Sequence, residues 1–76
     1  MSLEEKVKHA NEHFEELSSD QVITILKEIQ SHFQSQITQE YLRGKFEGIS
    51  KASEENEKKK LCSSLKPYFD WYLQGL

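Results

Sequence analysis

The sequence predicts an all-α protein, a compact four-helix bundle, and three observations lead to this prediction. Apolar residues recur at the three- and four-residue spacing of a helix face along most of the chain. Polar residues that can cap a helix precede these apolar stripes. The chain has 76 residues with only one proline and three glycines, and no segment shows the alternation that is typical of a β-strand. Amphipathic helices joined by short connections favour a bundle.

Length, charge and composition narrow the class of protein. We expect one domain over residues 1–76, which buries only about 60–65% of its unfolded surface, and therefore no enzyme and no cofactor site. The net charge is −3; residues 1–38 carry three lysines against seven acids, and residues 39–76 carry seven cations against six acids. This balance gives little attraction for nucleic acid or a membrane. Without a signal-peptide pattern or an 18-residue apolar run, we expect an intracellular protein, cytoplasmic or nuclear.

The first two helices have the clearest starts. Ser2 with Glu5, and Ser18 with Gln21, have the spacing of a capping box. The first helix is predicted over Ser2–Leu17 and the second over Ser19–Gln34. Their apolar stripes are Leu3, Val7, Ala10, Phe14 and Leu17 in the first, and Val22, Ile25, Leu26, Ile29 and Phe33 in the second. Because the second stripe is the most aliphatic, we expect that helix to be the central one.

The third helix is predicted to follow a short polar turn at residues 34–36. Thr38 is its expected cap, and Ile37 and Leu42 have the spacing of a hydrophobic staple. Gly44 and Gly48 lie four residues apart, so they either allow a close approach of another backbone, or Gly48 ends the helix.

The fourth helix is predicted to begin at Ser53 and to continue towards the end of the chain, with Pro67 inside its stripe. An interior proline removes a hydrogen bond and clashes with the preceding turn, at a cost of about 3 kcal/mol. Two interpretations follow. The helix is kinked near residues 63–67, or it stops there and Ser64 caps a new helix with Pro67 in its first turn. The stripe consists of Leu61, Leu65, Phe69, Tyr72 and Leu76.

Two possible chemical sites are a metal site at the histidine pair and a reactive thiol at the cysteine, and each has a simpler interpretation. His9 and His13 are one helical turn apart and can chelate a metal, but a site needs a further ligand, so we expect a solvated polar face and no metal site. Cys62 near Lys58–Lys60 can be a reactive thiol with a lowered pKa, or a small half-buried hydrophobe. We favour the second interpretation.

The C-terminal third carries the candidate binding residues. A basic surface is expected from Lys58, Lys59 and Lys60 together with Arg43, Lys45, Lys51 and Lys66. Trp71 lies off the core stripe, so it either packs over the end of the bundle or anchors a partner. We predict a protein-binding site with Trp71, Tyr68 and Tyr41 as anchors and Lys58, Lys59, Lys60 and Lys66 as a charged rim.

Residues 22–72 also carry a family resemblance. It rests on Val22, Ile25, Leu26 and Ile29, on Ile37-Thr38 followed by Leu42, and on Ile49, Leu61, Leu65 and Trp71. This pattern resembles the N-terminal domain of transcription elongation factor S-II, which related elongation and Mediator subunits also contain. The resemblance implies a non-enzymatic helical bundle that docks short disordered peptides of transcription factors.

Three functions therefore remain in view. The first is a non-catalytic interaction module, an adaptor with a role in transcription regulation, that binds a peptide or helix of another protein in a groove between helices. The second is a small acidic inhibitor of the immunity-protein type, which neutralises another protein through Glu12, Glu15, Glu16 and Asp20. The third is a homo-oligomer that pairs through the Leu3–Leu17 stripe. Nucleic acid is not an expected partner, because no aromatic-basic reading motif accompanies the lysines.

Overall fold

The computed structural model describes residues 2–75, and its regular secondary structure in this range is all helical, with no strand. The all-α prediction is therefore confirmed. The described range holds five α-helices rather than four, together with one short 3-10 helix. These elements are α1 (Leu3–Glu12), η1 (Phe14–Glu16), α2 (Ser19–Gln30), α3 (Gln36–Lys51), α4 (Glu55–Ser63) and α5 (Lys66–Leu73).

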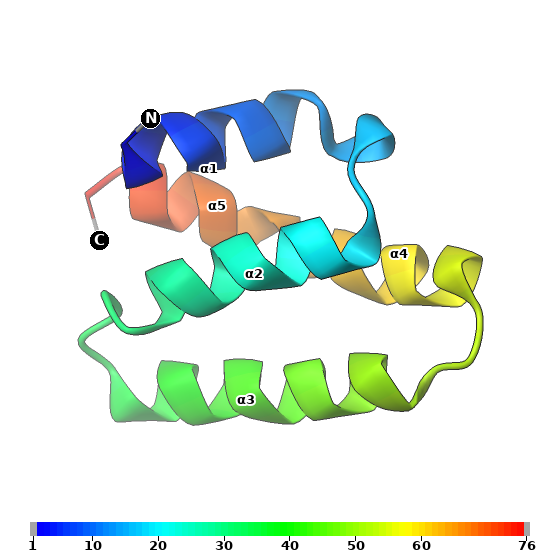
Figure 1. Cartoon of the computed structure of the whole chain (residues 1–76). Helices are drawn as coiled ribbons and strands as arrows, with labels where there is room; N and C mark the ends of the chain where they lie inside the picture. Colours follow the sequence, from blue (N-terminus) through cyan, green and yellow to red (C-terminus); the bar gives the residue numbers. More distant parts are fainter. Residues whose placement is uncertain (1, 76) are drawn as a thin grey trace.

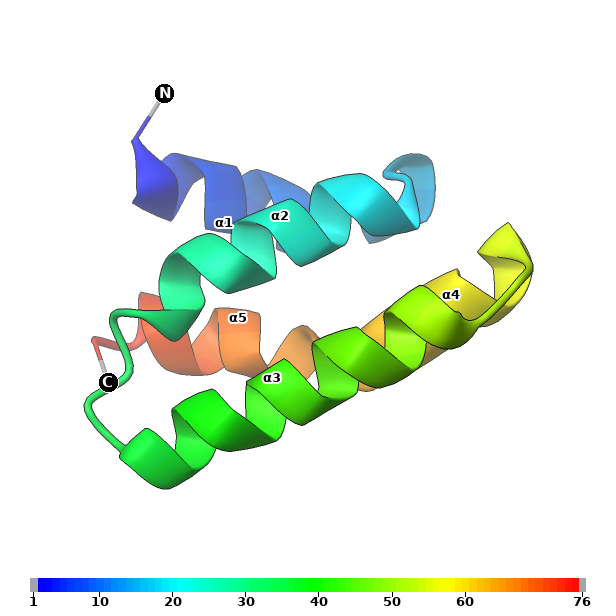
Figure 2. The same cartoon turned by 60° about the horizontal axis from the view of Figure 1, so that its bottom comes forward.

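Helix α2 is central, as predicted, because it contacts α1, α3, α4 and α5. Figure 1 shows α1, α2 and α3 as three successive rows, with α4 and α5 lying behind them. Figure 2 shows that α3 runs antiparallel to α4 and α5. The molecule measures 33 × 27 × 17 Å. No helix in residues 2–75 is long and apolar enough to cross a membrane.

The starts of α1 and α2 follow the predicted capping chemistry. The Ser2 hydroxyl accepts a hydrogen bond from the Glu5 backbone N–H. The Ser18 hydroxyl accepts from the Gln21 N–H, and the Gln21 side chain accepts from the Ser18 N–H at 2.9 Å, which completes the capping box. These caps satisfy backbone donors that have no partner inside the helix.

Both helices end earlier than predicted, because the chain tightens into i→i−3 turns. Helix α1 ends at Glu12 instead of Leu17, and η1 follows, with Leu17 N–H donating to the Phe14 carbonyl. This turn places Phe14 in the core at 4% exposure. Helix α2 ends at Gln30 instead of Gln34, and the Phe33 carbonyl accepts from the Gln39 side chain at 2.5 Å. A side chain of the next helix thus satisfies a carbonyl in the turn that follows α2.

The predicted start of the third helix was wrong. Ser35 is the cap, with its hydroxyl accepting from the Thr38 N–H, and Thr38 lies inside α3. Ile37 is 80% exposed while Leu42 is fully buried, so these two residues do not form the expected staple. Because Ser35 and not Thr38 is the cap, Ile37 lies inside α3, five residues before Leu42. Successive side chains are rotated by about 100° around a helix, so Ile37 points away from the side on which Leu42 is buried.

Neither interpretation of the two α3 glycines holds. Helix α3 continues past Gly48 to Lys51, and a Cβ atom built at Gly44 or Gly48 meets nothing within 4 Å. We therefore expect Gly44→Ala and Gly48→Ala each to raise the free energy of unfolding by about 0.5–1 kcal/mol, because alanine loses less conformational freedom in a helix. Urea unfolding followed by circular dichroism measures this change.

Gly75 provides the contrast for that measurement. It has a φ of 92°, a conformation that side chains with a Cβ rarely adopt. Gly75→Ala is expected to give no gain in stability. Equal gains at all three positions would contradict the explanation from conformational entropy.

The last predicted helix is two helices, as in the second interpretation of Pro67. Helix α4 ends at Ser63, and α5 begins at Lys66 with Pro67 in its first turn, where its missing N–H costs nothing. The predicted caps were wrong, because Glu54 and Leu65 occupy the cap positions and neither makes a side-chain cap hydrogen bond. This break is why the described chain has five α-helices instead of four.

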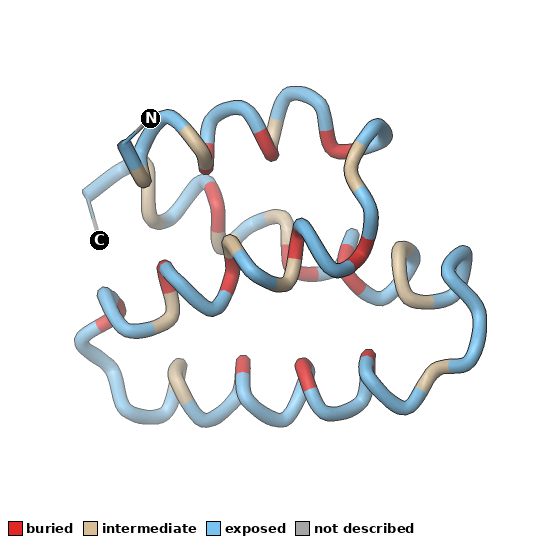
Figure 3. Tube along the Cα trace, in the orientation of Figure 1, coloured by how far each residue is buried: buried red, intermediate tan, exposed pale blue. Residues whose placement is uncertain are grey.

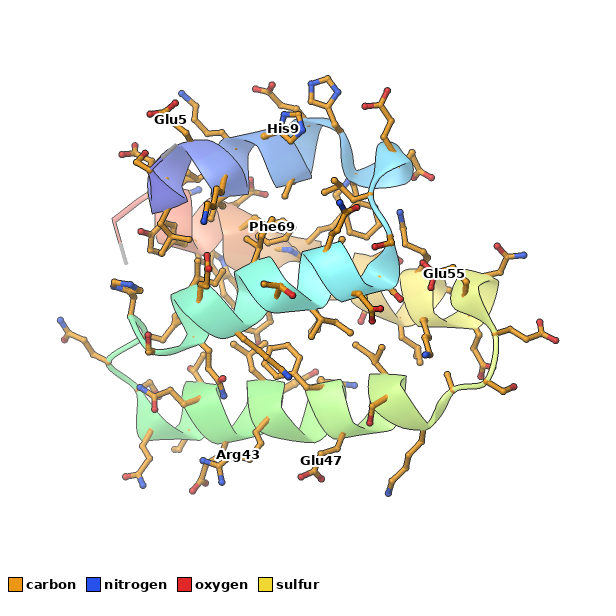
Figure 4. All side chains as sticks on the ribbon, viewed as in Figure 1. Glu5, His9, Arg43, Glu47, Glu55 and Phe69 are labelled. Atoms are coloured by element: carbon orange, nitrogen blue, oxygen red, sulfur yellow. The ribbon has the colours of Figure 1, made fainter. Side chains whose placement is uncertain are left out.

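The core lies between α2 and the helices around it. Figure 3 shows the buried positions of every helix turned towards the interior of the molecule. Phe69, Leu26, Ile29 and Leu42 are the largest of the fully buried side chains. Phe69 lies between the ribbons of α1 and α2 in Figure 4. The buried apolar residues are Val7, Ala10, Phe14, Val22, Leu26, Ile29, Phe33, Leu42, Phe46, Ile49, Cys62, Leu65 and Phe69.

Candidate functional site

Three predicted anchor residues gather on one surface, which we call the aromatic face: Tyr41 from α3, and Tyr68 and Trp71 from α5. The rings of Tyr68 and Trp71 meet edge to face with centroids 4.8 Å apart, and those of Tyr41 and Tyr68 lie 6.3 Å apart. Trp71 is 49% exposed and Tyr41 is 44% exposed. These rings therefore form one contiguous aromatic surface that water still reaches.

Tyr68 holds this surface to the core. Its ring packs edge to face against Phe33, with centroids 5.7 Å apart, and Phe33 is buried. Partial burial raises the pKa of the Tyr68 phenol, and the neighbouring Tyr41 phenol raises it further. Tyr68 therefore stays a neutral hydrogen-bonding group, and the face gains no negative charge from it.

The two charged residues of α5 point away from the aromatic face, towards α1 and η1. Asp70 accepts a hydrogen bond from the Asn11 side chain at 2.9 Å. The Lys66 ammonium lies 5.1 Å from the centre of the Phe14 ring. One side of α5 thus serves internal contacts with the N-terminal part of the chain, and the other side carries Tyr68 and Trp71.

Two lysines of the predicted rim, Lys59 and Lys66, lie at η1 instead of at the aromatic face. The Lys59 ammonium lies 4.6 Å from the Phe14 ring, on which Lys66 also lies. It also donates to the Phe14 carbonyl at 2.6 Å and to the Leu17 carbonyl. Lys58 and Lys60 make no aromatic contact and no ion pair within residues 2–75. The structure therefore brings together the three aromatic anchors, whereas Lys59 and Lys66 contact η1.

Lys45 is the cation that lies at the aromatic face. Its ammonium is 5.3 Å from the centre of the Tyr41 ring, within the range of a cation–π contact. Sequence reasoning placed Lys45 in the wider basic surface but not at the binding site. The signal was present in the sequence, because Tyr41 and Lys45 are one helical turn apart and therefore lie on the same side of α3.

Sequence reasoning also missed a set of contacts that we call the junction contacts: Glu55 and Lys59 of α4 with the η1–α2 segment. The Glu55 carboxylate accepts from both the backbone N–H and the hydroxyl of Ser19, each at 2.7 Å, at the N-terminus of α2. Figure 4 shows Glu55 at the end of α4 next to this helix start. Glu55 therefore accepts hydrogen bonds from the N-terminus of α2. Lys59, one turn later in α4, donates to the carbonyls of the segment that precedes α2.

Glu55 makes stability depend on pH. The hydrogen bonds from Ser19, the backbone bond first, lower the pKa of this carboxyl below its ordinary value of 4.5. A lowered folded-state pKa means that the stabilisation is fully present above pH 4.5 and is lost as the pH falls through the folded-state value. We expect wild type to exceed Glu55→Gln in free energy of unfolding at neutral pH, and the difference to shrink below pH 4.5 in urea unfolding series.

Glu57→Gln is the matched control for that series. Glu57 lies in the same first turn of α4 and is exposed, and no hydrogen bond joins its side chain to another described residue. Its substitution is expected to leave the pH dependence close to that of wild type. Parallel curves for Glu55→Gln and wild type would contradict a special role for Glu55.

The two histidines lie on the surface and the cysteine lies in the core. The rings of His9 and His13 lie 4.7 Å apart on the outer side of α1, and His13 contacts Glu16 at 3.2 Å. No group of three or more potential metal ligands occurs in residues 2–75. Cys62 is fully buried, and burial raises the pKa of its thiol, which excludes the interpretation as a thiol activated by lysines.

Two shallow hollows lie away from the aromatic face. One, of about 340 Å³, is at the end of the molecule where His32, Tyr72 and Leu73 meet Glu4. The other, also of about 340 Å³, lies between α2 and α3, over Phe46, with Lys27 and Arg43 at its sides. Both are open to solvent.

Comparison with known proteins adds no further constraint on the site. No protein-family model, no curated protein and no solved structure matches this chain.

Proposed function

We propose that this protein is a non-catalytic interaction module that binds a peptide or helix of another protein through the aromatic face. The observation that carries the proposal is that Tyr68 contacts both Tyr41 and Trp71. They come from helices about 30 positions apart in the sequence, and the two outer rings remain about half exposed. Tyrosine and tryptophan are the residues most often found at the energetic centre of protein interfaces.

The geometry supports binding more than internal packing. Trp71 packs against Tyr68, but about half of its surface is left in water. A partner that covered this surface would gain from apolar burial at about 25 cal/mol per Å². The rings are already held by Phe33 and Tyr68, so little side-chain freedom is lost on binding.

The resemblance to the elongation factor N-terminal domain supports the same class of function. Domains of that kind dock short disordered peptides of transcription factors. A role in transcription regulation is part of the proposal on the strength of that resemblance alone.

A second candidate function is an acidic inhibitor of another protein. It is favoured by one observation, which is that Glu12, Glu15, Glu16 and Asp20 are all exposed around η1. Charge reversal at Glu15 and Glu16 separates the two candidates. A partner lost on that reversal but retained by Trp71→Ala would favour the inhibitor.

The test of the leading proposal compares affinity capture by wild type, Trp71→Ala and Leu61→Ala. Leu61 is the control because it is a large apolar residue, 39% exposed, on a different helix. We expect partners that wild type and Leu61→Ala retain and Trp71→Ala loses. The affinity of the purified partner should fall by at least tenfold, since an interface hot spot contributes about 2 kcal/mol.

Self-association is examined in the same series. Sedimentation of wild type and Trp71→Ala at two concentrations shows whether a second copy of the chain covers the aromatic face. A partner set that is identical for wild type and Trp71→Ala, with no Trp71-dependent self-association, would refute the proposal.

A further inference from the structure

The positive charge at the aromatic face is that of Lys45, a residue of α3. Lys45 lies against the Tyr41 ring and forms no ion pair within residues 2–75. The carboxylate nearest to Trp71 in the sequence, Asp70, is held by Asn11 on the α1 side. An ammonium group at the edge of exposed aromatic rings, without a carboxylate of its own, is complementary to a negative charge on a partner.

The exposed side of α3 extends this surface in one direction. Ile37, Tyr41 and Lys45 follow one another at four-residue intervals, so they lie along one side of the helix. Ile37 is 80% exposed, the most of any large apolar residue described. The side therefore presents, in order, an aliphatic residue, an aromatic ring and a cation over about 12 Å of helix length.

The neighbouring glycines set the depth of this surface. Gly44 and Gly48 lie next to Lys45 on α3, and open space surrounds the position of each missing Cβ. The surface beside Tyr41 and Lys45 is consequently shallow, which suits the rounded profile of another helix. Since residues 2–75 contain no strand, a partner cannot bind there by extending a sheet edge.

We propose that the aromatic face takes an amphipathic helix of the partner protein. Its apolar side covers Ile37, Tyr41 and Trp71, and a glutamate or aspartate about two turns from the residue over Ile37 pairs with Lys45. The spacing follows from the 12 Å between the ends of the α3 side and the rise of about 1.5 Å per residue. This inference rests on the proposed function and adds the chemistry and orientation of the partner.

The probe is a displayed library of 16-residue peptides built on a helix-forming alanine-rich frame, with randomised positions at helical spacing. Selections are run on wild type, Lys45→Glu, Trp71→Ala and the control Lys27→Glu. Lys27 is an exposed lysine of α2 that makes no ion pair in the described part of the chain. Circular dichroism of each variant verifies that it is folded.

We expect wild type and Lys27→Glu to enrich peptides with an acidic residue about two turns from an apolar one. Lys45→Glu should select lysine or arginine at that position. A wild-type-selected peptide should bind Lys45→Glu about 3–10-fold more weakly, and its Glu→Lys version should recover the loss, as expected for a rim charge pair.

Two outcomes overturn the inference and are distinguishable. Peptides that need Trp71 but show no acidic preference, and bind Lys45→Glu as well as wild type, refute the partner chemistry and leave the interaction module intact. A library in which nothing enriched depends on Trp71 refutes both the inference and the proposed function.

Discussion

Phe69→Ala is expected to lower the free energy of unfolding by about 3–5 kcal/mol, the usual cost of truncating a buried phenylalanine. Phe69 is fully buried and lies between α1 and α2. Alanine there removes the apolar contacts and leaves a cavity that packed helices fill only in part. Domains of 76 residues have about 4–11 kcal/mol of stability, so the variant is expected to be largely destabilised. Urea unfolding followed by circular dichroism measures the change.

Tyr41→Ala is the matched control for Phe69→Ala. It removes an aromatic ring of similar size from a position that is 44% exposed, where no buried cavity forms. We expect its cost to be less than half that of Phe69→Ala. Similar losses for the two variants would contradict the assignment of Phe69 to the core.

Lys59→Met is expected to lower the free energy of unfolding by about 1.5–3 kcal/mol, the range for hydrogen bonds that involve a charged group. Methionine keeps the apolar part of the side chain but cannot donate to the Phe14 and Leu17 carbonyls. It also removes the cation from the Phe14 ring. The Leu17 carbonyl then faces the junction without the donor that Lys59 provides, which is costly at a partly buried place. Urea unfolding at neutral pH gives the value.

Lys60→Met is the control, because Lys60 is the next residue of α4, is exposed and makes no aromatic contact or ion pair within residues 2–75. A surface change of this kind is expected to stay within about 0.5 kcal/mol. If both variants lost the same stability, the effect would come from helix composition or net charge rather than from the junction contacts.

The candidate site was predictable in part. The tryptophan off the core stripe, next to the basic cluster, pointed to Trp71 with Tyr68 and Tyr41 as further anchors, and the structure places Tyr68 in contact with both other rings. The predicted lysine rim rests on proximity in the sequence to Trp71, whereas in the structure Lys66 lies towards Phe14 and Tyr68 lies towards Tyr41 of α3. Lys45, which is distant from Trp71 in the sequence, reaches the face because Tyr41 and Tyr68 bring α3 and α5 together.

The sequence by itself determined the features that depend on interactions between residues at most about four positions apart. Apolar periodicity determined the helices and most of the core, and the side chains of Ser2 and Ser18 determined where α1 and α2 begin. These interactions form inside one helical turn and need no partner from elsewhere in the chain.

The tertiary structure decided where helices end and which exposed residues share a surface. Helix α1 stops at Glu12 although no glycine or proline follows it, and Lys59, more than 40 residues later, donates hydrogen bonds to the Phe14 and Leu17 carbonyls of the turn that follows. Glu55 in the same way meets Ser19 at the start of α2. The free N–H and C=O groups at helix ends can form hydrogen bonds with any suitable group that packing brings near. Residues that are distant in the sequence therefore influence where a helix ends. The aromatic face arises for the same reason, since the packing of both α3 and α5 against α2 brings Tyr68 next to Tyr41.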